Sequence, residues 1–369
     1  MRIPVLKATR MRIDPCGDGG RISRAGWRIL IVALGVIILS PHVDAAASRS
    51  RPSAPSAAEA GAPVKAFMGA SYVELAPWAA HYGLKPVWVT KGRSLRLESA
   101  FTKILFEEDR REVIINNLRV FLGEPIVSSK GALWIGAIDA RDLLGPILRP
   151  AGISVSARPP KVICIDAGHG GNDTGTQNKT FKLDEKSMTL DVARRVQRLL
   201  QGQGYQVVMT RTDDRFVELE DRADIANRAK ADLFVSVHFN SFPQPSITGT
   251  EVYILTRSTQ RSTGATKRET SDRVSLPGNA MDPWSAVLGY AMHRQVKEKL
   301  GTFDRGLKFA RFKVLTLVNC PGVLVEAGYL SNDAEARRIS TADYRADIAV
   351  GIANGISTYA AQFEAARKG

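Results

Sequence analysis

The sequence is poor in cysteine and in histidine. Only three cysteines and five histidines occur in 369 residues. Three cysteines cannot build the disulfide framework of a small secreted scaffold, and Cys16 lies in the N-terminal tail. We expect Cys164 and Cys320 to be buried free thiols, with a single bridge between them after export as the alternative.

Long hydrophobic runs are also missing. The most apolar stretch, Ile29 to Leu39, has 11 residues, whereas a membrane-spanning helix needs roughly 20. A basic segment precedes it and small residues around Ala45 and Ala47 follow it, which is the pattern of a secretory signal peptide. We therefore assign residues 1–47 to a signal peptide, with an uncleaved anchor as the alternative and Met11 as a second candidate start. This predicts an exported protein of the periplasm or cell wall.

An excess of acidic residues is absent as well. The chain has 51 Lys and Arg against 37 Asp and Glu; seven of the basic and three of the acidic residues lie in 1–47, so the rest keeps a net charge of about +10. Positive charge favours an anionic partner. However, the sequence has neither zinc-finger spacing nor a basic stripe with interleaved aromatics. Together with export, this argues against nucleic acid as the partner.

The region after residue 47 begins with a linker and a small module. Residues 48–65 are rich in Ser, Ala and Pro, as linkers are. Residues 66–150 alternate short strand-like and helix-like segments, which predicts a small α+β module. The pattern loosely resembles the stalk-like module named after the N-terminal domain of copper amine oxidases. Nothing in it looks catalytic, and we expect His81 to be a surface or packing residue, so the module is assigned to wall binding or spacing.

Residues 160–366 alternate apolar strands with amphipathic helices. Strands are expected at 161–166, 205–211, 231–239, 250–256, 313–318 and 322–328, and helices at 185–200, 217–230, 283–300 and 342–363. Strands of nearly continuous apolar residues between helices predict an α/β domain whose sheet is buried on both faces. In such sheets, polar residues at the carboxyl ends of strands meet in a common crevice.

Four residues that can bind a metal or move a proton lie near the ends of these strands. His169, His238 and Glu326 each end a strand, and Glu185 opens the helix after a glycine-rich loop. Two imidazoles and one carboxylate form a catalytic zinc set with a position left for water, and a second carboxylate can then move the proton. Taken singly, each residue also has an ordinary structural explanation. The HExxH helix motif is absent, which excludes that class of metalloprotease.

Six segments between residue 161 and about residue 335 carry a specific resemblance. They read IDAGHGGNDTGT, DEKSMTLDVARRVQRLLQGQGYQVVMTRTDD, LEDRADIANRAKADLFVSVHFNS, TGTEVYIL, DRGLKFARFKVL and PGVLVEAGYLSN. In this order they resemble the zinc-dependent N-acetylmuramoyl-L-alanine amidases of the amidase-3 family. The resemblance implies a mixed, mostly parallel six-stranded sheet flanked by helices. It also implies one zinc ion bound by His169, Glu185 and His238, with Glu326 as the catalytic carboxylate.

The sequence departs from the family pattern in three places. Ala167 stands where proline is usual, which should not affect the chemistry. The loop before Glu185 has its own composition, so the adjacent Asp184 is a competing metal ligand. Residues 257–282 form a long charged segment; some relatives carry an inserted helix there that blocks the zinc, but the lack of an apolar face favours an open loop here.

The function implied is zinc-dependent hydrolysis of the amide between N-acetylmuramic acid and L-alanine in peptidoglycan. Two alternatives remain: an inactive peptidoglycan-binding or regulatory protein of the same fold, and a zinc peptidase acting within the stem peptide. Asn240 and Ser241 are candidates for substrate positioning, whereas Arg222, Asn227 and His293 are expected to be structural. We expect a monomer, and we allow for a protein activator that the sequence does not identify.

Overall fold

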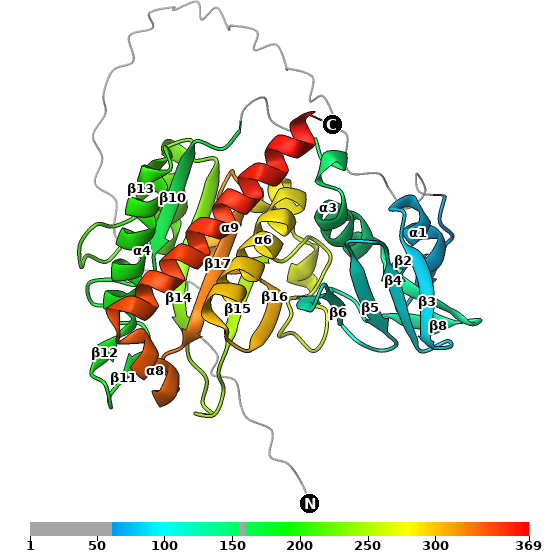
Figure 1. Cartoon of the computed structure of the whole chain (residues 1–369), viewed down its shortest axis with the longest axis horizontal. Coiled ribbons are helices and arrows are strands. Elements are labelled where there is room, and N and C mark those ends of the chain that lie inside the picture. The colour runs from blue at the N-terminus through cyan, green and yellow to red at the C-terminus, as the bar shows by residue number, and fades with distance from the viewer. Residues whose placement is uncertain (1–60, 155–158, 369) are drawn as a thin grey trace, which may run out of the picture. The chain divides into compact units, whose positions relative to one another are not determined.

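The computed structural model describes residues 61–154 and 159–368, which belong to one compact unit (Figure 1). The expected signal peptide and most of the expected linker lie outside the described residues. The expected linker, residues 48–65, overlaps the first strand by two residues, because that strand begins at Val64. None of the helices in the described part is long and apolar enough to cross a membrane.

Residues 61–153 form a small α+β module. Its strands are β1 (Val64–Phe67), β2 (Ala70–Glu74), β3 (Lys85–Thr90), β4 (Ser94–Glu98), β5 (Lys103–Glu107), β6 (Glu112–Ile115), β7 (Leu118–Phe121), β8 (Val127–Ser129) and β9 (Ala132–Gly136). Its helical parts are α1 (Leu75–His81), α2 (Ala137–Asp139), a π-helical turn (Ala140–Leu144), α3 (Gly145–Leu148) and a 3₁₀ turn (Pro150–Gly152). Asn116 and Asn117, with φ of 47° and 64°, form the two-residue turn between β6 and β7. Such a turn needs two left-handed residues, which asparagine tolerates.

The remaining described residues form the α/β part. Its strands are β10 (Val162–Ala167), β11 (Gln177–Asn178), β12 (Leu183–Asp184), β13 (Gln206–Met209), β14 (Leu233–Asn240), β15 (Thr250–Leu255), β16 (Asp304–Ala310) and β17 (Gly322–Tyr329). Its helices are α4 (Glu185–Gly202), α5 (Leu219–Arg228), α6 (Asp282–Leu300), α7 (Lys313–Thr316), α8 (Asp333–Ile339) and α9 (Ala342–Lys368). Helices α4, α6 and α9 lie side by side across one face of the sheet (Figure 1), while α5 packs against α7. The α4 face that carries Val192, Ala193, Val196 and Leu200 is fully buried.

The main sheet has the order β13-β10-β14-β17-β15-β16-β7-β6-β5-β4-β3. Strands β13, β10, β14 and β17 run parallel, β15 pairs antiparallel to β17, and β16 runs parallel to β15. The expected mixed, mostly parallel α/β sheet flanked by helices is therefore confirmed. The α/β part contributes six strands, as expected, but the sheet continues into five strands of the module and has 11 strands in all.

One strand was assigned to the wrong segment. Residues 313–318 were expected to be a strand, but Lys313–Thr316 form helix α7, and β16 takes the sheet position. Val314, Leu315 and Val318 are buried against Phe234 and Leu324. A short apolar run does not distinguish a strand from a buried helical turn. The sequence of β16, DRGLKFA, carries three charged residues and a glycine among seven and has no continuous apolar run, so it did not look like a buried strand.

The module is joined to the sheet through β7 and β16. Leu307 pairs with Val120 in parallel register, and the Arg119 amide donates to Asp304 Oδ2 at 2.7 Å. Buried apolar residues from both parts belong to one continuous core. The module and the α/β part are therefore packed as one body, not as two separately folded domains.

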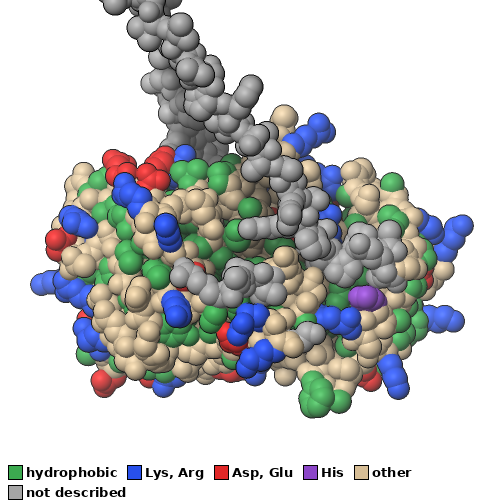
Figure 2. Space-filling model, turned by 90° about the horizontal axis from the view of Figure 1, so that it is seen from above, with side chains coloured by type: hydrophobic (Ala, Val, Ile, Leu, Met, Phe, Trp, Pro, Cys, Tyr) green, Lys and Arg blue, Asp and Glu red, His purple; other side chains and the backbone are tan. Residues whose placement is uncertain are grey.

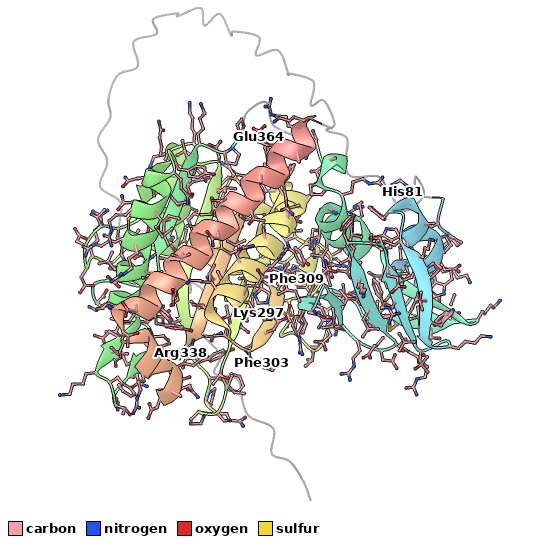
Figure 3. The ribbon with its side chains drawn as sticks, viewed as in Figure 1. His81, Lys297, Phe303, Phe309, Arg338 and Glu364 are labelled. Atoms are coloured by element: carbon pink, nitrogen blue, oxygen red, sulfur yellow. The ribbon has the colours of Figure 1, made fainter. Side chains whose placement is uncertain are left out.

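Residues 257–281 pack on this junction. Arg268 pairs with Glu124 of the module at 2.7 Å, and Arg257 lies 3.9 Å from the fully buried Asp139. The Arg257 guanidinium also lies over the ring of Phe309, 4.5 Å from its centroid. Figure 3 labels Phe309, which belongs to β16. The segment contains two 3₁₀ turns, Thr270–Arg273 and Pro277–Met281, and no α-helix before α6. It therefore helps to fasten the module to the sheet.

Charged side chains are dispersed over the face of the molecule shown in Figure 2. Lys and Arg side chains lie both around the rim and across the middle of this face, with Asp and Glu among them.

Candidate metal centre and active site

The loop after β10 forms one wall of the site, and its glycines are required there. His169 has a φ of 60°, which is rare for a residue with a side chain. A Cβ at Gly168 would lie 2.3 Å from the His238 ring, and one at Gly175 would lie 2.6 Å from the His169 ring and 2.7 Å from Glu185 Oε2. The glycines thus leave room for the side chains that converge here.

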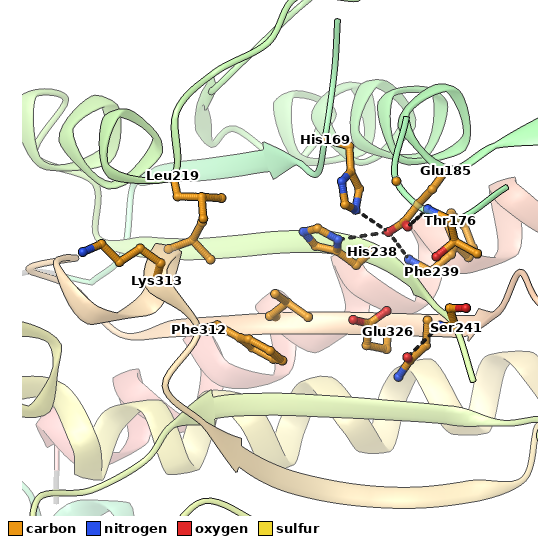
Figure 4. A pocket seen from close by; sticks show the side chains of 14 residues that line it. His169, Thr176, Glu185, Leu219, His238, Phe239, Ser241, Phe312, Lys313 and Glu326 are labelled. Carbon is orange, nitrogen blue, oxygen red and sulfur yellow. Dashed lines mark hydrogen bonds and ion pairs between the residues drawn. The ribbon is translucent and has the colours of Figure 1, made fainter. Parts of the chain in front are cut away.

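Three of the four expected residues form a compact group of metal-ligand atoms. Donor atoms of His169, Glu185 and His238 all lie within 4.8 Å of one another. His169 Nε2 and His238 Nδ1 each lie 3.0 Å from Glu185 Oε1 (Figure 4). The competing residue Asp184 does not join this group, because its carboxylate accepts from Gln177 Nε2 at 2.8 Å.

Glu185 is held in place by backbone groups. It is buried at the start of α4, and its Oε1 and Oε2 accept from the amides of Phe239 at 2.9 Å and Thr176 at 2.8 Å. Burial alone would raise the pKa of Glu185, but hydrogen bonds from the two histidines outweigh it and hold the pKa well below its usual range. The site therefore holds a carboxylate anion beside two imidazoles.

Asp173 supports the group from outside and was not singled out from the sequence. Its Oδ2 lies 2.8 Å from His169 Nδ1. A carboxylate at that position keeps a proton on Nδ1 and leaves Nε2 free to bind a metal. Its signal in the sequence is its place four residues after His169 in the same glycine-rich loop.

Glu326 lies on β17 and enters the same pocket. Its Oε2 is buried and has no hydrogen-bond partner among the described residues. Burial raises the pKa of Glu326 well above its usual value; Glu185 and Glu251 raise it further, and Lys308 opposes them. Glu251 faces Glu326 across the antiparallel β15–β17 pair and contacts Lys308. The sequence reasoning did not identify Glu251 or Lys308.

An ion pair under the loop fixes the backbone of His169. Arg222 Nη1 donates to Asp166 Oδ1 at 2.8 Å, and Arg222 Nη2 donates to the His169 carbonyl at 2.9 Å. Arg211 Nη2 donates to the Gly168 carbonyl at 2.8 Å. Asn227 bonds the backbone of residues 317 and 319. Arg222 and Asn227 therefore have the structural contacts expected of them.

The group opens into a pocket of about 390 Å³, a size typical of ligand sites. Fourteen residues line it: His169, Gly175, Thr176, Glu185, Leu219, His238, Phe239, Asn240, Ser241, Phe312, Lys313, Val314, Leu324 and Glu326. All four expected site residues are among them, as are Asn240 and Ser241. His293 is buried outside the pocket, and its Nε2 lies 2.7 Å from Asp304 Oδ1. No residue of the 257–282 segment lines the pocket.

The two cysteines that the structure describes take no part in the site. Cys164 and Cys320 are buried and free, as expected. Burial raises the pKa of both thiols, and that of Cys320 reaches about 12. A thiol with a raised pKa is a poor nucleophile and a poor metal ligand at neutral pH.

The donor set satisfies the requirements of a small, borderline-soft dication. Two neutral imidazole nitrogens and one carboxylate oxygen are the protein ligands of many catalytic zinc sites. Two imidazole nitrogens lie close to one buried carboxylate oxygen. A cation bound among these three atoms would be coordinated by all of them. Asp173 supplies the outer carboxylate that such histidine ligands usually have.

Comparison with known proteins gives the following relatives. Residues 163–358 match the family Amidase_3, described as N-acetylmuramoyl-L-alanine amidase. N-acetylmuramoyl-L-alanine amidase AmiC of Escherichia coli O6:H1 is 32% identical over 221 residues, covering 54% of this chain and 53% of that protein. AmiA of Salmonella typhimurium is 30% identical, covering 54% of this chain and 76% of that protein.

Solved structures are also similar to part of this chain. The catalytic domain of CwlV, an N-acetylmuramoyl-L-alanine amidase from Bacillus (Paenibacillus) polymyxa, is 34% identical with a TM-score of 0.45. It matches 54% of this chain and 97% of that domain. The chain spans about half the length of AmiC of E. coli O6:H1.

Proposed function

The chain belongs to the Amidase_3 family of N-acetylmuramoyl-L-alanine amidases, and we propose that it hydrolyses the amide bond between N-acetylmuramic acid and L-alanine in peptidoglycan. One observation carries the proposal: the donor atoms of His169, Glu185 and His238 converge within 4.8 Å in a pocket that also contains Glu326. A binding module that had lost its catalytic activity would not need all four of these residues.

The proposed cofactor is one zinc ion per chain. His169, Glu185 and His238 would hold it, and Asp173 would orient His169. When bound, zinc would act as a Lewis acid toward the scissile carbonyl and would make water more acidic.

Glu326 would move the proton. A carboxylate with a raised pKa accepts a proton readily near neutral pH and returns it to a leaving group. Its unpartnered Oε2 has no competing hydrogen bond among the described residues. Glu326 would take the proton of the attacking water and pass it to the amine of L-alanine as the amide bond breaks.

The rest of the chain is assigned as follows. We propose that residues 1–47 direct export to the periplasm or cell wall and that the protein acts there as a monomer. Residues 160–366 would carry the catalysis. The module would serve mainly as a fixed part of the catalytic body, because its strands continue the sheet.

Product analysis of a defined muropeptide tests this function. The purified full chain with zinc should release the intact stem peptide with a free L-alanine amine and leave the sugar with a free lactyl carboxylate. Mass spectrometry distinguishes these products from peptide fragments, which would indicate a peptidase. Binding of peptidoglycan without release of peptide would instead indicate an inactive wall-binding protein.

A further inference from the structure

The pocket has two chemically different ends. On one side of the catalytic group, the start of α5 and the α7 segment supply Leu219, Phe312 and Lys313. On the other side lie Thr176 and the end of β14 with Asn240 and Ser241. Figure 4 shows Leu219, Phe312 and Lys313 together, with Ser241 and Thr176 on the opposite side of His238 and Glu326.

The first end combines an apolar floor with one cation. Leu219 is 47% exposed, and the apolar residues Val314 and Leu324 also line the pocket. Outside the two histidines, Lys313 is the only basic residue among the fourteen that line the pocket. Its Nζ lies 3.1 Å from Glu220 Oε1, and both side chains are about half exposed. Solvent-exposed ion pairs contribute little free energy. A carboxylate of a bound ligand can therefore replace Glu220 as the partner of Lys313 at a small cost in free energy.

The second end is polar and carries no free charge. Asn240 Nδ2 donates to Glu251 Oε1 at 2.6 Å, and Asn240 Oδ1 accepts from the Ser241 amide at 2.7 Å. These bonds fix the amide beside the exposed Ser241 hydroxyl. Neutral amides and hydroxyls are suited to a sugar with hydroxyl and acetamido groups.

The proposed substrate has the same asymmetry. On one side of the scissile amide is a neutral glycan, and on the other is a peptide with free carboxylates and small apolar side chains. We propose that the peptide lies over Leu219 and Phe312 with one of its carboxylates paired to Lys313, and that the glycan lies at the Asn240 and Ser241 end. This orientation rests on the proposed function. It makes Lys313 a residue that selects acidic stem peptides.

Charge-matched substrates test the orientation. Four muropeptides would be compared: one with all its carboxylates free, and three in which the carboxylate of the second residue, the third residue or the C-terminus is amidated. Wild type should have a kcat/KM about tenfold lower for the one form that lacks the carboxylate bound by Lys313, mainly through KM. K313M should lose the same factor on the free form and show no further loss on that amidated form. E220Q, which removes the competing anion, should raise kcat/KM for the free form by roughly two- to threefold.

K299M is the matched control, because Lys299 forms a half-exposed ion pair with Asp347 at 2.7 Å on helices α6 and α9. It should retain the wild-type preference. The orientation would be overturned by equal wild-type kcat/KM values on all four substrates, or by a K313M loss that is the same on every form; either result leaves the proposed amidase function intact. Hydrolysis of no substrate by wild type would overturn both.

Discussion

Asp166 and Glu326 are two acids on strands of the same sheet, and their surroundings differ in almost every respect. Asp166 on β10 is fully buried, and its carboxylate accepts from Arg222 at 2.8 Å, Thr210 at 2.6 Å and Ser236 at 2.6 Å. Burial would raise the pKa of Asp166, but Arg222 and the two hydroxyls outweigh it and lower the pKa. Glu326 on β17 has a buried oxygen that no group in the described part of the chain pairs with, and its pKa is raised by burial and by its acidic neighbours.

The difference separates a carboxylate that stabilises the fold from one available for chemistry. A buried carboxylate with all its hydrogen bonds made is held as an anion and contributes to the structure. A buried carboxylate left without partners costs stability, and such groups mark functional sites. In the sequence, both acids follow apolar strand residues and look alike.

Replacing Glu326 should give the largest effect on activity. E326Q removes the proton acceptor, so kcat should fall by roughly 10³-fold, while zinc content stays at one per chain by elemental analysis. Stem-peptide release from purified peptidoglycan measures it. Activity of E326Q within tenfold of wild type would contradict the assigned role.

Replacing Arg222 should give the largest effect on stability. R222L leaves Asp166 as a buried charge without its cation, which costs about 3–5 kcal/mol in the free energy of unfolding. Denaturant titration measures it. R294L is the control, because Arg294 forms an exposed i,i+4 pair with Glu298 and should change stability by less than about 0.5 kcal/mol. Equal losses of unfolding free energy in R222L and R294L would contradict a larger contribution of the buried Arg222–Asp166 pair to stability.

Replacing Asp173 should weaken metal binding without abolishing it. D173N keeps the shape of the side chain but removes the charge that orients His169, so zinc affinity should fall by roughly 10- to 100-fold. Competition with a chromogenic chelator measures it. N172A, a change of the neighbouring loop residue, should leave the affinity near that of wild type.

The two acids should also respond oppositely to pH in zinc-free protein. The lowered pKa of Asp166 contributes stability that is present above the unfolded-state value of about 4 and is lost as pH falls through the folded pKa. The raised pKa of Glu326 has the opposite sign: stability is greatest below the unfolded value and declines as pH rises toward the folded pKa. E326Q should therefore be more stable than wild type at pH 7, by roughly 1 kcal/mol or more, and this advantage should disappear near pH 4. Thermal unfolding of both proteins across this range checks the sign.

The four residues that the sequence singles out for the candidate site lie together in one pocket, and each of them is next to a distinctive local pattern in the sequence. His169 lies among glycines, His238 and Glu326 follow apolar strand residues, and Glu185 begins an amphipathic helix. The residues that were not foreseen act across the sheet. Glu251 and Lys308 come from β15 and β16 and approach Glu326 only through strand order, which local sequence patterns do not encode.

The fold was predictable where apolar periodicity is strong and failed where it is weak. Strands β10, β14 and β17 are nearly continuous apolar runs. Strand β16 interrupts its apolar residues with charged ones, among which Asp304 accepts from the Arg119 amide and Lys308 pairs with Glu251. The pairing of β7 with β16 depends on two segments nearly 190 residues apart, and neither is unusual by itself.

The junction between β7 and β16 has a consequence for truncated forms of the protein. In the described residues, β16 lies between β15 and β7, so both of its edges are occupied. Removing residues up to 158 would turn β16 into an exposed edge strand with unpaired N–H and C=O groups and the apolar ring of Phe309 beside them. Exposed edges of this kind template intermolecular strand pairing. An isolated catalytic segment is therefore expected to aggregate, and the module acts as a covalently attached cap on the sheet.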